Sequence, residues 1–365
     1  MRPGHHTQNR FDVDLRAIAA NVATVRRSIG AGVWLCVALK ADAYGFGLLP
    51  VAKTVLDAGA DAVAVGSVAD GITLRQHRIR APILVYGGER LGPSSVRELE
   101  QYRLIGTVHN ADSLRMCRQS ARRGLEVMIE VDVGLWRLGF DRHDVAQVAE
   151  AIRAEDALRL RGIYTHMRVE ARPDARGMKN QFAAFLAALR SAGPVPLTIA
   201  ASSRVLDRSS AMVLNGVDVG RAVYGLLPSR SGRLGPRLKP AFARLRSQLT
   251  TLKPVPPQSR TGSLAAVRLL GVIPFGRASG MPGISVGAVL IRGRRARVVG
   301  APSLEHTRID LSRHPTARVG DEVVVLGRQG TAEISAAEVL RAHPELPDSA
   351  LALQVGAAVE RFYLS

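Results

Sequence analysis

The sequence has few of the features that mark secreted, membrane-spanning or disulfide-stabilised proteins. Only two of its 365 residues are cysteines, Cys36 and Cys117, which is too few for a disulfide framework. No apolar stretch reaches the length of a membrane span, and residues 1–10 contain no apolar segment of a secretory signal. We therefore expect a cytoplasmic protein without a membrane partner, in which Cys36 is a small core residue.

Acidic residues and lysine are scarce beside arginine. The formal net charge is +19, and the only lysines are Lys40, Lys53, Lys179, Lys239 and Lys253. The arginines are scattered and form no long basic tract with interleaved aromatic residues, so we predict no nucleic-acid partner. The positive charge instead favours encounters with anionic small molecules, such as a phosphate-bearing cofactor.

Strands and helices alternate from about Asp12 to Leu227. Short apolar runs occupy 33–39, 62–65, 83–86, 104–108, 127–131, 162–165, 197–200 and 217–223, with helical segments between them. Eight strands with intervening helices predict an α/β fold, a (β/α)8 barrel. An open, doubly wound sheet is the alternative, although no Gly-x-Gly-x-x-Gly follows the first strand.

The pattern changes after Tyr224. Residues 229–240 are rich in Gly, Pro, Ser and Arg, which is typical of a linker. Beyond them we predict a smaller all-β domain with one short helix at 334–340, and strands at 265–273, 286–291, 296–299, 308–311 and 322–326. The expected domains are a barrel at 12–235 and a C-terminal β-domain at 236–365.

Lys40 is the most informative residue, because it ends the first apolar run of the predicted barrel and opens a glycine-bearing turn. Desolvation lowers the pKa of an amine, and a neutral amine can attack a carbonyl to form a Schiff base. Barrel enzymes carry their sites at the carboxyl ends of the strands. Other polar residues predicted at this rim are Tyr44, Tyr86, Arg137, His166, Ser202, Ser203, Asp218, Gly220 and Arg221. No metal site is predicted.

Several motifs resemble those of one family. The run VALKADAYGFG at 37–47 resembles the pyridoxal-phosphate (PLP) lysine motif of alanine racemases. Residues 131–139, VDVGLWRLG, are similar to the loop that carries the family's active-site arginine, and 162–166 to its strand with a stacking histidine. Residues 223–228, 271–276 and 320–327 also look like family segments. The chain thus resembles the alanine racemases, which are fold-type-III PLP enzymes.

The resemblance implies a PLP barrel followed by a β-domain, assembled as a head-to-tail homodimer in which the partner's β-domain completes each active site. Lys40, Arg137 and His166 would be catalytic. From the rim residues and the resemblance together, we predict that the cofactor is bound by Lys40, Tyr44, Tyr86, Arg137, His166, Ser202, Ser203, Asp218, Gly220 and Arg221. Among them, Ser203, Gly220, the amide of Arg221 and Tyr44 suit the phosphate, since hydroxyl and N–H groups bind phosphate well.

The chain departs from the family pattern at the substrate side of the site. Asp218 stands where the family has an arginine against the pyridine nitrogen, unless the local register differs. A carboxylate favours the protonated pyridinium, which is the stronger electron sink. Gln258 occupies the position of the family's second-base tyrosine, and an amide is no general base near neutral pH. Ser303-Leu304-Glu305 differs from the family's triplet in the substrate-facing loop. Glu305 and His306 are candidates to replace the missing base.

These observations lead to three hypotheses. The first is a PLP-dependent racemase or epimerase that acts at the Cα of an amino acid other than alanine. The second is a PLP-dependent lyase or decarboxylase, which the carboxylate of Asp218 would suit. The third is a PLP-binding relative without turnover.

Overall fold

The computed structural model describes residues 8–170, 174–227, 232–281 and 283–365, which form two compact units. The described residues of 16–43 and 47–240 make up the barrel unit, and those of 1–15, 44–46 and 241–365 make up the β unit. The start of the predicted linker, residues 229–231, lies outside the described residues.

The predicted (β/α)8 barrel is confirmed. Eight parallel strands run in the order β4-β3-β2-β10-β9-β8-β6-β5, with the short β7 (Phe140–Asp141) paired to β6. Backbone pairing between Leu84 and Ile105 links β4 to β5 and brings the two ends of the sheet together. The strands are β2 (Trp34–Ala38), β3 (Ala62–Val65), β4 (Ile83–Val85), β5 (Gly106–Val108), β6 (Leu125–Asp132), β8 (Leu158–Thr165), β9 (Leu197–Ser202) and β10 (Gly216–Val219).

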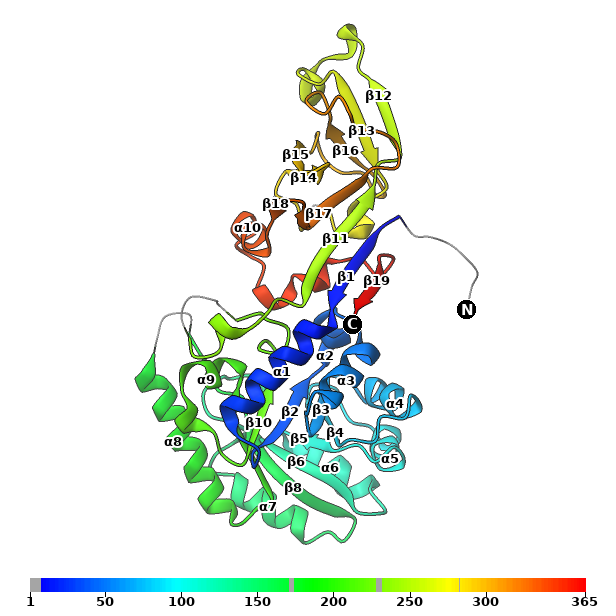
Figure 1. Cartoon of the computed structure of the whole chain (residues 1–365). Coiled ribbons are helices and arrows are strands. Elements are labelled where there is room, and N and C mark those ends of the chain that lie inside the picture. The colour runs from blue at the N-terminus through cyan, green and yellow to red at the C-terminus, as the bar shows by residue number, and fades with distance from the viewer. Residues whose placement is uncertain (1–7, 171–173, 228–231, 282) are drawn as a thin grey trace. The chain divides into compact units, whose positions relative to one another are not determined.

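Helices follow the strands and lie outside the barrel (Figure 1). They are α1 (Leu15–Ile29), α3 (Leu48–Asp57), α4 (Val68–Gln76), α5 (Pro93–Gln101), α6 (Ala111–Ser120), α7 (Val145–Arg153), α8 (Ala175–Ala192) and α9 (Ser203–Arg208). Helix α1 buries Ile18, Val22 and Val25 at helical spacing. Its Asn21 amide donates to the carbonyl oxygens of Val223 and Lys239, which fixes the segment after β10 against the helix.

Strand β10 is shorter than the predicted run 217–223. The chain leaves the strand after Val219, because the amides of Val223 and Leu226 bond to the carbonyl oxygens of Gly220 and Arg221 in successive turns. The last barrel strand therefore ends at a turn-rich segment that carries Gly220 and Arg221.

The β unit contains two sheets, whose strands pair antiparallel except for β1 and β19, which are parallel. Its larger sheet runs β15-β14-β17-β11-β1-β19, with β18 on β17, and its smaller sheet runs β12-β13-β16. The strands are β1 (Arg10–Asp14), β11 (Phe242–Gln248), β12 (Thr251–Pro254), β13 (Leu269–Ile273), β14 (Ala288–Ile291), β15 (Arg294–Arg297), β16 (Thr307–Asp310), β17 (Glu322–Gln329), β18 (Ala332–Ile334) and β19 (Glu360–Leu364). The predicted helix is α10 (Ala336–Ala342), capped by the Ser335 hydroxyl.

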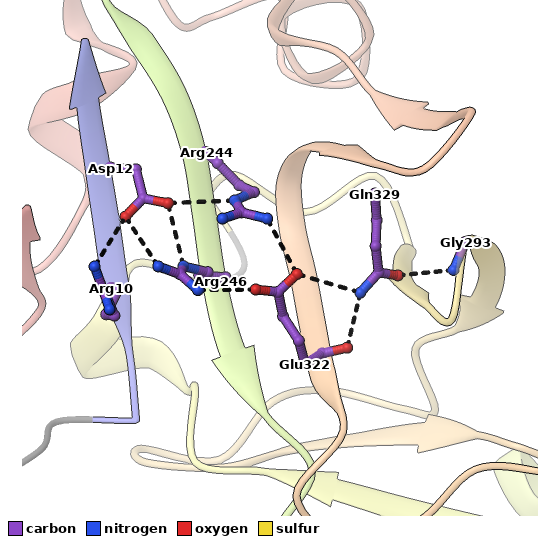
Figure 2. Close-up of polar contacts among 7 residues, drawn as sticks. All are labelled: Arg10, Asp12, Arg244, Arg246, Gly293, Glu322 and Gln329. Carbon is purple, nitrogen blue, oxygen red and sulfur yellow. Dashed lines mark hydrogen bonds and ion pairs between the residues drawn. The ribbon is translucent and has the colours of Figure 1, made fainter. Parts of the chain in front are cut away.

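Strand β1 comes from the start of the chain yet lies inside this C-terminal sheet, between β11 and β19. Asp12 on β1 is 2% exposed and forms ion pairs with Arg244 and Arg246 of β11. Both arginines also pair with Glu322 of β17, so one polar network spans three strands (Figure 2). Since the buried Asp12 pairs with two arginines of β11, the network helps to hold β1 in place beside β11.

Candidate active site

A polar layer sits at the carboxyl ends of the barrel strands. Cys36, Leu84, Met128 and Tyr164 belong to one buried cluster from four different strands, and Cys36 is a core residue as predicted. Side chains two positions apart on a strand share a face. Tyr86, Glu130 and His166 each follow a member of this cluster by two residues, so they continue the barrel interior at its carboxyl end.

Lys40 lies two residues beyond the end of β2 and is half-buried. Its Nζ lies 5.4 Å from the centroid of the Tyr86 ring, within the range of a cation–π contact. Burial lowers the pKa of the Lys40 amine, and Arg137 lowers it further, while the charge of Asp218 opposes them. A larger share of the amine is therefore neutral and nucleophilic near neutral pH than for an exposed lysine.

The turn after Lys40 has an unusual backbone. Ala41, Asp42 and Ala43 all have φ near +53° and ψ near +50°, the left-handed helical region, and Tyr44 has a φ of 59°. That conformation costs about 1–2 kcal/mol for each residue with a Cβ atom. The Asp42 carboxylate accepts a hydrogen bond from the amide of Leu48, which ties the turn to the start of α3. Strain of this kind persists only where the surroundings enforce it, and it is concentrated at functional sites.

Asp218 on β10 lies opposite the middle of β2, in register with Cys36 on one side and Ser202 of β9 on the other. The Tyr86 hydroxyl donates a 2.7 Å hydrogen bond to its Oδ2. Its Oδ1 is buried and has no hydrogen-bond partner among the described residues. Burial raises the pKa of Asp218, opposed by the Tyr86 hydrogen bond and the charge of Lys40. A buried carboxylate oxygen without a donor is costly, so it is a natural acceptor for the N–H of a bound molecule.

His166 follows β8 and is surrounded by positive charge. Burial lowers the pKa of His166 to about 4, and the positive charges of Lys40 and nearby arginines contribute to this shift. The imidazole is thus neutral at physiological pH. A neutral ring suits packing against an aromatic face better than an imidazolium would, because it needs no counter-ion.

Ser203 opens α9 at the end of β9 and is buried. Its hydroxyl oxygen accepts hydrogen bonds from the amides of Gly220 (3.0 Å) and Ala222 (3.2 Å). The structure therefore brings Ser203 together with the Gly220–Arg221 turn, the two segments predicted to hold a phosphate. The neighbouring Ser202 is half-buried and makes no cap hydrogen bond to α9.

Arg137 lies in the loop between β6 and β7. The Asp132 carboxylate accepts hydrogen bonds from the amides of Gly134 and Leu135 and so shapes the first turn of this loop. A Cβ atom at Gly139 (φ 117°) would lie 2.5 Å from the amide nitrogen of Asp132, so the close return of the loop requires glycine. Arg137 is exposed, but its charge still influences the pKa of Lys40 and of His166.

Three buried residues, Glu130, Tyr164 and Thr107, are linked by their polar side-chain atoms. Tyr164 donates to the Glu130 carboxylate (3.1 Å), and its oxygen lies 3.2 Å from the hydroxyl of Thr107. Burial raises the pKa of Glu130, while the hydrogen bond from Tyr164 and the charge of Arg137 lower it. Tyr164 and Thr107 were not among the predicted site residues. The spacing of two between Tyr164 and His166 is the signal that identifies Tyr164.

Comparison with known proteins settles the family. The alanine racemase N-terminal domain model matches residues 13–228, and the C-terminal domain model matches 243–363. The chain belongs to the alanine racemase family. It is 31% identical over 342 residues to an alanine racemase of Halothermothrix orenii, covering 90% of this chain and 89% of that one. Alanine racemase 2 of Bacillus subtilis is also 31% identical, covering 90% and 88%. An alanine racemase structure from E. faecalis superposes with a TM-score of 0.89 at 26% identity, covering all of both chains.

Alanine racemases are PLP-dependent isomerases, and this chain is a PLP-dependent, racemase-like enzyme of that family. The barrel residues fit the cofactor, because a depressed-pKa amine, a neutral imidazole and an unpartnered carboxylate oxygen share one rim. Tyr44 belongs to the β unit, and its predicted contact with the phosphate stays a prediction.

The β unit presents the loop that carries the candidate second bases. The amide of Ala278 bonds to the carbonyl oxygen of Leu304, and a Cβ atom at Gly276 would lie 2.6 Å from the amide nitrogens of Glu305 and His306. These contacts hold the loop in place while its side chains stay exposed, and Leu304 is 68% exposed. Gln258 lies in a 3-10 turn at 257–259 and is also exposed.

Proposed function

We propose that this enzyme racemises or epimerises an amino acid other than alanine at its Cα. The proposal rests mainly on Lys40. Burial lowers the pKa of its amine, which lies at the rim of the barrel near Tyr86 and Asp218. Bound PLP would withdraw electrons from the Cα of the substrate amino acid and make its proton acidic. Lys40 would accept and return that proton on one face.

Each remaining barrel residue has one proposed task. Arg137 would bind the substrate carboxylate or the phenolic oxygen of the cofactor, since a guanidinium recognises oxyanions well. His166 would lie against the pyridine ring in its neutral form. Ser203, Gly220, Arg221 and Tyr44 would hold the phosphate, with Ser202 beside them. The buried Glu130 would orient Arg137 through its charge.

The substrate-facing residues support a substrate other than alanine. Gln258 stands where the family's catalytic tyrosine is expected, and Leu304 and Glu305 replace residues of the substrate loop. With glutamine at that position, racemisation of alanine by the family's two bases would lack its second base. We propose that Glu305 or His306, from a second copy, accepts the proton on the other face.

The candidate second bases belong to the β unit, and the resemblance to the family implies that this unit completes the site of a partner copy. We propose a head-to-tail homodimer in which each β-domain, residues 236–365, completes the partner's site. Trp136 in the Arg137 loop is 87% exposed, and Leu304 is 68% exposed. Large apolar side chains left so exposed beside functional residues are typical of an interaction surface.

Asp218 favours one alternative reaction. A carboxylate at the ring nitrogen makes the cofactor a stronger electron sink, which also suits loss of carbon dioxide or of a side-chain fragment. A PLP-dependent lyase or decarboxylase is therefore the second candidate.

Incubation of the PLP-loaded enzyme with a panel of L- and D-amino acids in deuterium oxide separates the candidates. Racemisation predicts deuterium at Cα with inversion of configuration and no fragment. Release of carbon dioxide or an aldehyde would instead establish the lyase or decarboxylase. Lys40→Ala serves as the control, and it should abolish both exchange and the visible absorbance of the bound cofactor. A wild-type protein that binds PLP but shows no spectral change with any amino acid would be a non-catalytic relative.

A further inference from the structure

Tyr86 contacts both Asp218 and Lys40. It follows β4, whereas Asp218 lies on β10, with β3 and β2 between them in the sheet. The tyrosine spans this gap because the intervening interior positions are small. Ala62 and Ala64 of β3 are fully buried in the same cluster, and the Tyr86 ring packs against it.

The hydroxyl and the ring of Tyr86 serve different partners. The hydroxyl donates to Asp218 Oδ2 at 2.7 Å, while the ring faces Lys40 Nζ at 5.4 Å. A carboxylate held by one oxygen has a fixed rotamer, and its other oxygen, Oδ1, then points to a defined place. In this site Oδ1 is buried and lacks a donor.

We propose that Tyr86 is a positioning residue, which fixes Asp218 through Oδ2 so that Oδ1 receives the N–H of the cofactor's pyridinium ring. The proposal rests on the proposed function, in which Asp218 faces the ring nitrogen. The hydrogen bond also makes Asp218 a weaker base, since donation by Tyr86 opposes the effect of burial on the pKa of Asp218. A less basic Asp218 leaves the shared proton on the ring nitrogen, where it strengthens the electron sink.

The alternative is that Tyr86 merely fills the barrel. A filling role needs the ring but not the hydroxyl, so Tyr86→Phe separates the two roles while it keeps the contact with Lys40. Tyr102→Phe is the control, because Tyr102 ends α5 before the amino end of β5 and so lies away from the rim that carries Lys40 and Asp218. Asp218→Asn removes the carboxylate itself.

The test is the ¹⁵N NMR resonance of full-length protein loaded with PLP labelled at the pyridine nitrogen, together with the PLP dissociation constant. Tyr86→Phe should move the resonance toward the unprotonated value and weaken PLP binding several-fold, because Asp218 is then no longer held in the position that receives the ring N–H. Tyr102→Phe should leave the resonance at the wild-type position. Asp218→Asn should give the fully unprotonated signal.

Two results separate failure of this proposal from failure of the proposed function. A wild-type resonance in Tyr86→Phe, with a shifted one in Asp218→Asn, would overturn the role of Tyr86 alone. An unchanged resonance in Asp218→Asn would show that Asp218 does not face the ring nitrogen. If Tyr86→Phe fails to fold, site-specific 3,5-difluorotyrosine at position 86 replaces it. Its stronger hydroxyl donor should move the resonance toward the protonated value, and no movement would contradict the proposal.

Discussion

At the scale of single residues, the site depends on a balance of charges around Lys40. Burial and the charge of Arg137 lower the pKa of the amine, whereas Asp218 and Glu130 raise it. The two carboxylates are themselves buried and have raised pKa values. Each ionised group therefore depends on its neighbours, and a change of one should appear in the titration of another.

Removal of the Asp218 charge should make Lys40 more reactive. Because Asp218 stabilises the ammonium form, Asp218→Asn lowers the pKa of Lys40 further, and the amine should react several-fold faster with an acylating reagent at a fixed pH below that pKa. The measurement is labelling of the Lys40 peptide in cofactor-free protein by mass spectrometry. Glu126→Gln, which removes an exposed charge from β6, is the control, and equal rates in all three proteins would contradict the prediction.

The depressed pKa of His166 predicts a pH-dependent stability. The folded protein holds His166 neutral down to about pH 4, whereas the unfolded chain binds a proton near pH 6.5. The unfolded state therefore binds more protons between these values, and stability falls as the pH falls through this window, by roughly 3 kcal/mol at full shift. Urea unfolding of cofactor-free His166→Gln should show a loss in free energy of unfolding between pH 6.5 and 4 that is smaller than that of the wild type by this amount. The exposed His77→Gln should behave as wild type.

At the scale of elements, the turn after Lys40 is the part that sequence patterns describe worst. The segment Ala41-Asp42-Ala43 contains no glycine, yet all three residues are left-handed. Alanine and aspartate do not favour that region, so the conformation is imposed by the fold around it. The apolar run before Lys40 predicted the strand correctly, because a parallel strand covered on both faces is apolar at every position, and residues 35–39 are all buried.

Glycine substitution should reveal the strain in this turn. In a right-handed helix, replacement of an exposed alanine by glycine costs about 1 kcal/mol, so Ala183→Gly in α8 should be destabilised by that amount. Ala41→Gly should cost nothing or stabilise the protein slightly, since glycine adopts the left-handed region freely. Both are measured as free energies of unfolding. An equal loss in the two variants would mean that Ala41 is not strained.

At the scale of the whole molecule, the alternation of strands and helices was enough to predict the barrel, and the glycine-punctuated runs were enough to predict the β-domain. The place of β1 was not predictable in this way. Its partners on β11 lie more than 230 residues away in sequence, and local patterns carry no information on such pairings. The same holds for Tyr86, whose partner Asp218 is 132 residues away.

The Asp12 network should be important for the stability of the β unit. Asp12 is 2% exposed, and its removal leaves Arg244 and Arg246 with only Glu322 as an acidic partner among the described contacts. Because the arginines are partly exposed to water, we expect Asp12→Asn to cost about 1–3 kcal/mol in free energy of unfolding. Glu333→Gln, which breaks the exposed pair with Arg328, should cost less than about 0.5 kcal/mol. Similar values for both would show that the network adds nothing.

The central claim is that Lys40 carries PLP in a family barrel where a carboxylate faces the ring nitrogen. A crystal structure of the PLP-loaded enzyme tests it most directly. The account predicts a covalent bond from Lys40 Nζ to the cofactor and Asp218 Oδ1 at about 2.7–3.0 Å from the pyridine nitrogen. A cofactor bound away from Lys40, or a ring nitrogen that faces another group than Asp218, would contradict it.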